Sequence, residues 1–339
     1  MESIAYTEVD VLEEIPLYID MRAFRSIQAI GMINAMVGFY FSRRNTYLLI
    51  KEADFDMEKK LLEAGIPTTN LIAVSSLLNV NIKKNGVVVL PFQRISLELV
   101  LLRMASKIKV WTFVHDLHFL SRRKLLQDDR GFFPKFVRKL LYIFTIKFCD
   151  NVLCDSLLVQ KQIKRIFNRE STKVRLLRLF QKSIVERIFE PRKFDYFIKL
   201  DVREYKGFWA LPWLVFDDKS PVVAIEEQFF DRAVKILTKL NPDAIFFKVN
   251  TKSDADLVRV YKSSKAVLYL SRHEGFGFVP YEAGFFGAVP IVLRCSTYIQ
   301  SSPAFLTLKF GGIINVPRMR SISYPKSCMD LCSKHIAVF

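Results

Sequence analysis

The sequence predicts an α/β fold made of two doubly wound parallel sheets. Short apolar runs of strand length alternate with amphipathic helical patterns, and they do so in two separate series. A charged stretch that contains Pro191 separates the two series. We therefore expect a first domain at residues 1–182, a second at 183–320, and a C-terminal segment at 321–339.

The elements of each series follow from their patterns. In the first series, strands are expected at 47–50, 71–74, 87–92, 110–114 and 152–154, with helices at 56–64, 96–105 and 133–148. In the second series, strands are expected at 195–200, 222–225, 244–249, 266–270 and 291–293, with helices between them. Alternation of this kind indicates parallel strands joined by crossover helices.

Composition and charge limit the classes of function. The chain has 339 residues, 51% hydrophobic and 25% charged, which is typical of a folded protein with room for two domains. Its 51 Lys and Arg against 34 Asp and Glu give a net charge of +17, so we expect an anionic partner: nucleic acid, a membrane surface or a phosphorylated ligand. The five scattered cysteines predict reduced thiols rather than a zinc site. With no signal peptide or transmembrane pattern, we expect a cytoplasmic location.

The stretch from Ala266 to Cys295 is the most informative part of the chain. An apolar strand is followed by a polar turn with Gly275 and Gly277, and a helix is expected to begin near Pro280. A second apolar strand follows, so the turn should lie at the carboxyl end of a parallel strand, where open α/β sheets bind ligands. Backbone amides at the start of such a helix favour an anion, such as a diphosphate.

Two carboxylates flank this turn. Glu274 lies in it and Glu282 in the first turn of the helix, so both can face one cleft without being helical neighbours. Alone, such a pair is often only a solvated turn and a dipole-stabilised surface residue. The full run of strand, Glu-Gly-Phe-Gly, Pro, second Glu and Val-Pro-Ile-Val closely resembles the E-x7-E signature of retaining GT-B glycosyltransferases, most like glycosyltransferase family 4.

That resemblance implies a GT-B architecture, in which two Rossmann-like domains face each other across a cleft. It implies a nucleoside diphosphate sugar donor of UDP or GDP type, an acceptor that is a glycan, a lipid-linked molecule or a protein, retention of anomeric configuration, no catalytic metal and no further cofactor. Glu274 would bind the donor sugar and Glu282 the ribose, with donor contacts from Gly275, Phe276, Gly277 and Phe278. The C-terminal segment at 321–339 would cross back to the first domain.

Three further residues match the resemblance. Lys206, and less closely Arg203, stand where the family contacts the diphosphate, although a solvated charged turn is the plain alternative. His115 follows an apolar strand and corresponds to a histidine near the transferred sugar, whereas a lone histidine there is more often structural. The family's glycine-rich loop after the first strand has no counterpart between Ile4 and Ala29, which leaves the acceptor side open.

Two other features have competing interpretations. Asp254-Ala255-Asp256 resembles a metal-binding motif, but we expect it to begin a helix as capping and dipole-stabilising residues. The segment from Ser121 to Phe148 mixes basic and apolar residues in a way that suits either peripheral contact with an anionic membrane or an ordinary surface helix with a buried apolar face.

Other functions remain open at this point. Among enzymes, these are a GT-B sugar-nucleotide epimerase and a DNA-modifying glycosyltransferase, which the positive charge favours. From another class come a catalytically silent glycosyltransferase-like module and a basic nucleic-acid-binding protein, although the chain shows no compact nucleic-acid motif.

Overall fold

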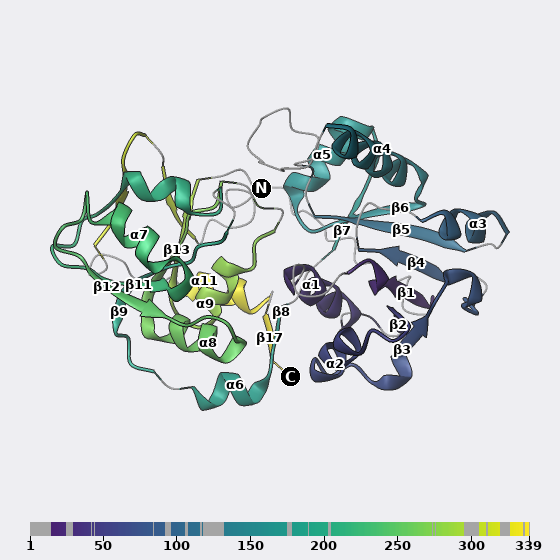
Figure 1. The fold of residues 1–339 in the computed structure, drawn as a ribbon, viewed down its shortest axis with the longest axis horizontal. Helices are drawn as coiled ribbons and strands as arrows, with labels where there is room; N and C mark the ends of the chain where they lie inside the picture. Colours follow the sequence, from purple (N-terminus) through teal and green to yellow (C-terminus); the bar gives the residue numbers. More distant parts are fainter. Residues whose placement is uncertain are drawn as a thin grey trace. The chain divides into compact units, whose positions relative to one another are not determined.

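The chain forms two compact units in this computed structural model: the first holds most of the chain before residue 177, and the second holds residues 155–162 and the chain from residue 177 onward (Figure 1). The structure describes residues 15–24, 30–41, 43, 45–83, 85–91, 96–105, 108–115, 117, 132–174, 178–188, 190–202, 205–272, 274, 276–294, 305–309, 311–318, 326–334 and 336–338. Each unit is built on its own parallel sheet.

The first unit has a seven-stranded parallel sheet in the order β3-β2-β1-β4-β5-β6-β7. Its strands are β1 (Leu17–Asp20), β2 (Thr46–Lys51), β3 (Leu71–Val74), β4 (Val87–Leu90), β5 (Lys109–Val114), β6 (Asn151–Cys154) and β7 (Thr172–Lys173). The helices are α1 (Ile30–Phe41), α2 (Phe55–Glu63), α3 (Leu97–Ala105) and α4 (Phe132–Phe148), and α5 (Leu157–Phe167) is divided between the two units after residue 162.

The strand order decides which face each helix of the first unit covers. From β1 the chain proceeds outward through α1 and α2 to β3, and from β4 it proceeds the opposite way through α3 and α4 to β6. Because parallel crossovers are right-handed, reversing the direction of travel moves the helices to the other face of the sheet. Thus α3 and α4 share one face, and α1 and α2 cover the other.

The second unit has a six-stranded parallel sheet in the order β12-β11-β9-β13-β14-β15. Its strands are β9 (Phe194–Ile198), β11 (Val222–Glu226), β12 (Ile245–Val249), β13 (Ser264–Tyr269), β14 (Val289–Leu293) and β15 (Leu306–Leu308), and its main helices are α7 (Phe230–Leu237), α8 (Asp254–Ser263) and α9 (Val279–Phe285). A buried apolar cluster under this sheet includes Ile198, Ile225, Leu268 and Ile291.

Two short strand pairs complete the second unit. β10 (Leu214–Phe216) pairs with β16 (Ile314–Val316), and β8 (Arg178–Phe180) pairs with the C-terminal β17 (Ile336–Val338). The remaining helices are α6 (Lys182–Arg187) and α11 (Lys326–Ser333), and α11 packs against α9. The described C-terminal residues therefore lie in the same compact unit as α9.

The fold class predicted from the sequence is confirmed: both sheets are parallel and helices join their strands. The predicted strands at 71–74 and 222–225 match β3 and β11 to within a residue. The interior strand β1 was not predicted from the sequence. Among the described residues, no helix combines the length and apolar character needed to span a membrane.

Candidate functional site

The predicted turn lies at the carboxyl edge of the second sheet, directly after β13. Ser271 forms an isolated antiparallel bridge with Lys206, and the amide of Arg272 donates to the carbonyl of Tyr205 at 3.0 Å. These bonds hold the segment that follows β9 against the segment that follows β13. Two strand ends that are neighbours in the sheet thereby bring Lys206 and Glu274 together.

Glu274 is buried and held by three side chains. Its Oε1 accepts hydrogen bonds from the hydroxyls of Tyr269 at 2.7 Å and Ser271 at 2.8 Å. The ammonium of Lys206 lies 2.9 Å from Oε1 and 3.1 Å from Oε2. These donors hold the carboxylate in one orientation and place an ammonium beside it at the sheet edge.

Glu282 is also buried, within the first turn of α9, but its partners differ. Its Oε1 accepts from Nε of Arg178 at 3.0 Å, and its Oε2 accepts from the hydroxyl of Tyr261 at 2.8 Å. Arg178 also bonds to Asp254 at 2.5 Å and lies over the ring of Phe180. Burial together with the neighbouring Glu282 raises the pKa of Tyr261 well above its ordinary value.

The beginning of α9 follows the sequence prediction closely. Gly277 has a φ of +74°, a left-handed conformation that glycine adopts without strain, and Pro280 stands in the first turn. Phe276 stacks on Tyr281 with ring centroids 4.8 Å apart, and the ring of Phe278 meets that of Phe276 edge to face. The two phenylalanines therefore anchor the turn by packing.

A second acid–base pair at the same sheet edge was not predicted. Glu226 ends β11 and is 1% exposed; it pairs with Lys199, accepts from the amide of Leu200 at 3.0 Å and from the hydroxyl of Thr251. Lys199 stands just after β9, where the resembling family usually has a glycine. Neither residue belongs to a recognisable motif, because only the adjacency of β9 and β11 brings them together.

Of the other predicted site residues, the structure describes His115. His115 lies in the first unit, at the end of β5, with its ring stacked on Phe113 at 4.3 Å. Its predicted contact with the donor stays a prediction. Arg203 and Gly275 lie outside the described residues.

Asp254 and Asp256 lie in the first turn of α8, as expected, and Ser253 caps this helix by accepting from the amide of Asp256 at 3.1 Å. Asp254 is committed to Arg178. In the described part of the chain, no group of three or more His, Cys, Asp or Glu side chains is arranged to hold a metal ion.

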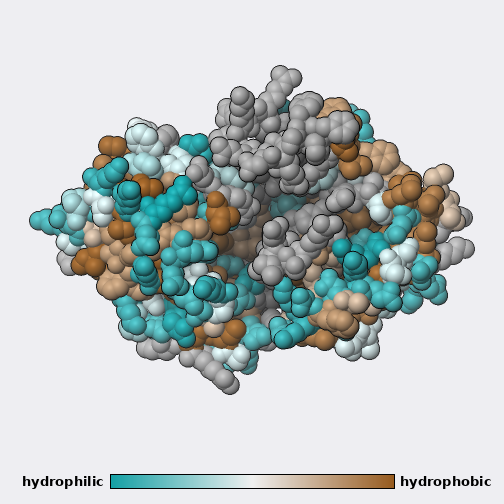
Figure 2. All heavy atoms as spheres, viewed as in Figure 1, coloured by the Kyte–Doolittle hydropathy of each residue, from teal (hydrophilic) through white to brown (hydrophobic). Residues whose placement is uncertain are grey.

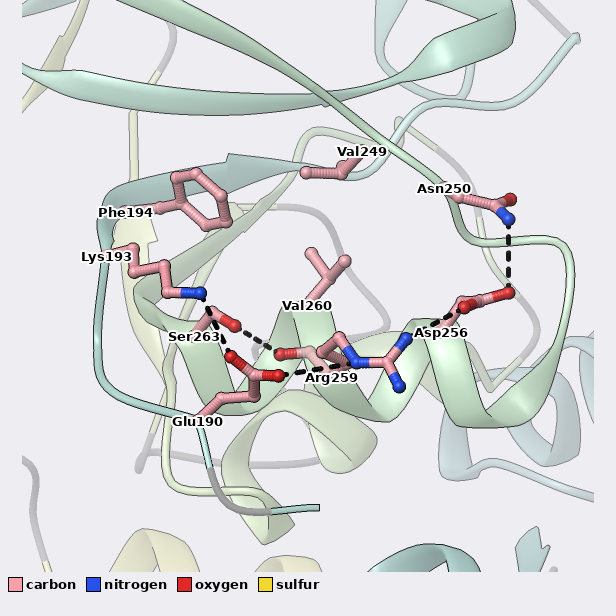
Figure 3. Close-up of a pocket in the computed structure, with 9 residues that line it drawn as sticks. All are labelled: Glu190, Lys193, Phe194, Val249, Asn250, Asp256, Arg259, Val260 and Ser263. Atoms are coloured by element: carbon pink, nitrogen blue, oxygen red, sulfur yellow. Dashed lines mark hydrogen bonds and ion pairs between the residues drawn. The ribbon is translucent and has the colours of Figure 1, made fainter.

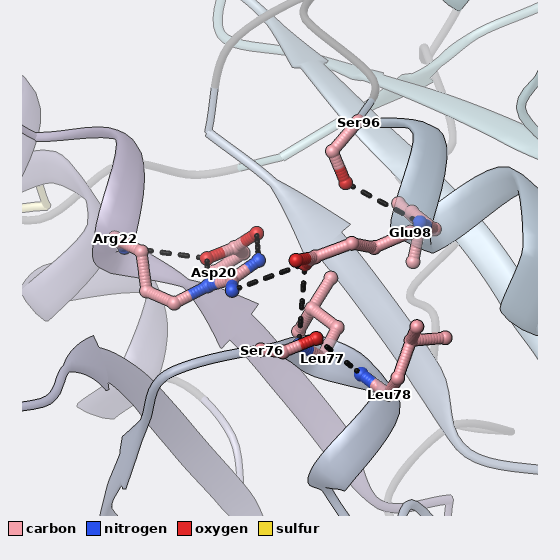
Figure 4. Close-up of polar contacts among 8 residues, drawn as sticks. Asp20, Arg22, Ser76, Leu77, Leu78, Ser96 and Glu98 are labelled. Carbon is pink, nitrogen blue, oxygen red and sulfur yellow. Dashed lines mark hydrogen bonds and ion pairs between the residues drawn. The ribbon is translucent and has the colours of Figure 1, made fainter.

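The carboxyl edge of the first sheet carries a different charged cluster (Figure 4). The guanidinium of Arg22 makes two bonds to Asp20, of 2.9 and 3.1 Å, and a third to Glu98 at 3.3 Å. Glu98 also accepts from the amide of Leu77 at 3.2 Å. The cluster ties the end of β1 to the start of α3, where the resembling family has a glycine-rich loop.

A cavity of about 190 Å³ lies between α8 and the strands beside it, away from the predicted residues (Figure 3). Its charged groups satisfy one another: Glu190 pairs with Lys193 at 3.2 Å and with Arg259 at 3.4 Å, and Arg259 pairs with Asp256 at 3.1 Å. The cavity therefore shows no charged group directed at a ligand.

Comparison with known proteins agrees with this architecture. Residues 222–300 match the family described as glycosyl transferases group 1, a range that contains both Glu274 and Glu282. No curated protein sequence matches the chain.

Among solved structures, HepE of Anabaena in complex with UDP and glucose has 13% identity and a TM-score of 0.56, covering 88% of this chain and 86% of that chain. Sucrose-phosphate synthase of Thermosynechococcus elongatus has 12% identity and a TM-score of 0.53, covering 87% and 86%. The chain thus has an α/β fold that matches GT-B glycosyltransferases, with a segment similar to group 1 in its second unit.

Proposed function

We propose that this protein transfers a sugar from a nucleoside diphosphate donor to an acceptor, with retention of anomeric configuration and without a catalytic metal. The observation that carries the proposal is the pair of Lys206 and the buried Glu274, 2.9 Å apart at the carboxyl edge of the second sheet. It lies beside a left-handed glycine turn that opens α9. The match to group 1 over residues 222–300 supports the same assignment.

In such a reaction the difficult step is departure of the nucleoside diphosphate, so stabilising charge on the leaving oxygens lowers the barrier. Lys206 supplies a positive charge for this purpose, and its ammonium can turn from Glu274 toward a phosphate because a lysine side chain is flexible. Glu274 would then accept hydrogen bonds from donor-sugar hydroxyls. Arg203, Gly275 and the amides of Phe276 and Gly277 complete the proposed donor contacts.

Glu282 is proposed to accept from the ribose hydroxyls. A carboxylate has about four lone-pair directions, so its bonds to Arg178 and Tyr261 leave acceptor capacity. Those two partners fix the carboxylate in one orientation before the donor arrives. His115 is proposed to contact the sugar from the first unit.

A UDP-type donor is proposed first, because HepE, which has a similar fold, was solved with UDP-glucose. The test is a thermal-shift screen with UDP, GDP, ADP and their sugar conjugates, since a ligand that binds only the folded state raises the melting temperature. We expect one nucleotide series to stabilise the protein and Glu282→Gln to reduce that shift. If none of the nucleotides stabilises the wild-type protein, the transferase proposal is wrong.

A sugar-nucleotide epimerase would consume the donor without any acceptor. Incubation of the stabilising donor alone, followed by analysis of the sugar released, separates these two outcomes. The proposed transferase should leave the donor sugar unepimerised, and slow hydrolysis is the expected background.

A further inference from the structure

Helix α4 has an exposed apolar stripe on its outer face. Phe136, Leu140 and Phe144 are 46%, 49% and 48% exposed, and they are spaced at i, i+4 and i+8, which places them on one side of a helix. Val137 and Leu141 widen the stripe by one further row. Five large apolar side chains in one continuous stripe are thus open to solvent.

The core of the first unit lies on the opposite side of the same helix. Tyr142, Thr145 and Ile146 are buried, and they alternate with the exposed positions as expected for an inward face. The exposed stripe is therefore additional to the face that packs on the sheet. This observation excludes the interpretation in which the apolar residues of this helix are all core.

Helix α3 repeats the arrangement. Leu97, Leu101 and Met104 are 74%, 47% and 80% exposed at i, i+4 and i+7, whereas Leu99 is fully buried. No membrane or partner role was predicted for this helix from its sequence. A second exposed apolar stripe thus lies on the element that precedes β5.

The two stripes belong to one side of the molecule. Both helices cover the same sheet face, and Arg103 of α3 joins the end of α4 by an ion pair with Asp150 at 2.7 Å and by lying over the ring of Phe148. Figure 2 shows hydrophobic side chains over α3 and α4 at the upper right. We call this the α3–α4 surface: Leu97, Leu101, Met104, Phe136, Val137, Leu140, Leu141 and Phe144.

The charged residues near this surface indicate which kind of partner it binds. The sequence of α4 contains four basic residues and no acidic one, and two of the four, Lys139 and Lys147, are exposed on the same helix as the stripe. The nearby acids Glu98 and Asp150 are already paired with Arg22 and Arg103. Apolar stripes with basic neighbours match the interface of an anionic bilayer, in which acyl chains accept the apolar groups and headgroups accept the cations.

Other occupants fit less well. A second copy of the chain would bring the same net charge of +17, and a nucleic acid presents chiefly charged phosphates to a protein surface, which do not cover two apolar helix stripes. We propose that the α3–α4 surface docks this protein on an anionic membrane. Combined with the proposed function, on which this last step depends, docking places the acceptor at the bilayer and makes a lipid-linked acceptor the expected class.

The test is vesicle flotation of the full chain with phosphatidylcholine vesicles and with vesicles in which a third of the lipid is phosphatidylglycerol. Wild type should float with the anionic vesicles and much less with the neutral ones. The double variant Leu140→Glu with Phe144→Glu should reduce binding by about tenfold or more, because it puts charge into the apolar stripe. Leu101→Glu with Met104→Glu should have a similar effect and tests the contribution of α3 separately.

The control is Phe55→Glu on α2, an even more exposed aromatic residue on the helix layer of the opposite sheet face, which should leave vesicle binding unchanged. Circular dichroism and melting temperature must show that every variant is folded. Equal flotation of wild type and both double variants would overturn the proposal. So would a concentration-dependent dimer that the double variants abolish, or a preference for DNA over anionic vesicles that the variants remove.

The same variants distinguish this inference from the proposed function. Nucleotide stabilisation should be unchanged in Leu140→Glu with Phe144→Glu, since these residues lie in the first unit and the proposed donor contacts tested by the screen lie in the second. If the protein binds vesicles but no nucleotide raises its melting temperature, the transferase proposal and the lipid-linked acceptor are wrong. The membrane-docking proposal for the α3–α4 surface would still hold.

Discussion

Glu274 and Glu282 belong to one sequence motif, yet their surroundings differ. Glu274 lies in the turn and is held by a lysine and two hydroxyls, whereas Glu282 lies in a helix between an arginine and a fully buried tyrosine. A lysine ammonium can exchange one partner for another at little cost, but a buried arginine with two carboxylates cannot. We infer that Glu274 and Lys206 form the adaptable part of the site and that Glu282 forms its rigid part.

The largest expected effect is on the stability of the protein, and it follows from a change to the pair of Arg178 and Glu282. Arg178→Ala should lower the free energy of unfolding by about 3 to 5 kcal/mol, because it leaves the carboxylate of Glu282 buried without its charged partner. Urea unfolding measures this change. The exposed pair of Lys182 and Glu186, at 3.7 Å, provides the control, and Lys182→Ala should cost less than about 1 kcal/mol.

A double variant sharpens this result. Arg178→Met combined with Glu282→Met should be less destabilising than the sum of the single changes, since it removes both charges of the buried pair. Strict additivity of the two changes in unfolding free energy would mean that Arg178 and Glu282 do not interact. The inference that Glu282 forms the rigid part of the site would then be wrong.

The next largest effect is on turnover, and it follows from a change to Lys206, the partner of Glu274. Lys206→Ala should lower turnover by about a hundredfold, through loss of positive charge near the leaving phosphates. It should cost less than about 2 kcal/mol in stability, because Tyr269 and Ser271 continue to donate to Glu274. Transfer rates with the donor found by the screen, together with urea unfolding, check both statements.

Lys219→Ala, at an exposed position of the same unit, is the control for a general loss of positive charge. If both lysine variants had equal turnover, Lys206 would have no special role at the leaving group.

The smallest expected effect is the loss of stability on removing the hydroxyl of Tyr261, and it tests whether Tyr261 or Arg178 holds Glu282. Tyr261→Phe should cost about 1 to 2 kcal/mol near neutral pH, because Glu282 loses the hydroxyl donor and keeps Arg178. Chemical unfolding at pH 7 measures it. A cost as large as that of Arg178→Ala would show that the hydroxyl, and not the ion pair, holds Glu282.

The same variant has a pH signature. The pKa of Tyr261 is raised in the folded state, so its contribution is fully present below the ordinary tyrosine pKa of about 10 and is lost as pH rises above that value. Tyr261→Phe should therefore make the decline of stability above about pH 10 shallower.

The sequence predicted the parts of this protein that depend on local patterns. The two series of strands and helices and the start of α9 at Pro280 follow from periodicity and turn residues, so they are readable over short stretches. The position of the Glu274 turn after an apolar strand is also a local pattern, whereas the pairing of Glu274 with Lys206 appears only in the structure.

Only the tertiary structure decided which distant groups meet. Arg178 is 104 residues from Glu282, and the sheet topology, with β8 paired to the C-terminal β17, brings it to α9. In the same way, an amphipathic pattern shows that α4 has an apolar side but cannot show how much of it the sheet covers. The exposed stripe of α4 appears only when the packed face is known, because burial depends on neighbours that are distant in sequence.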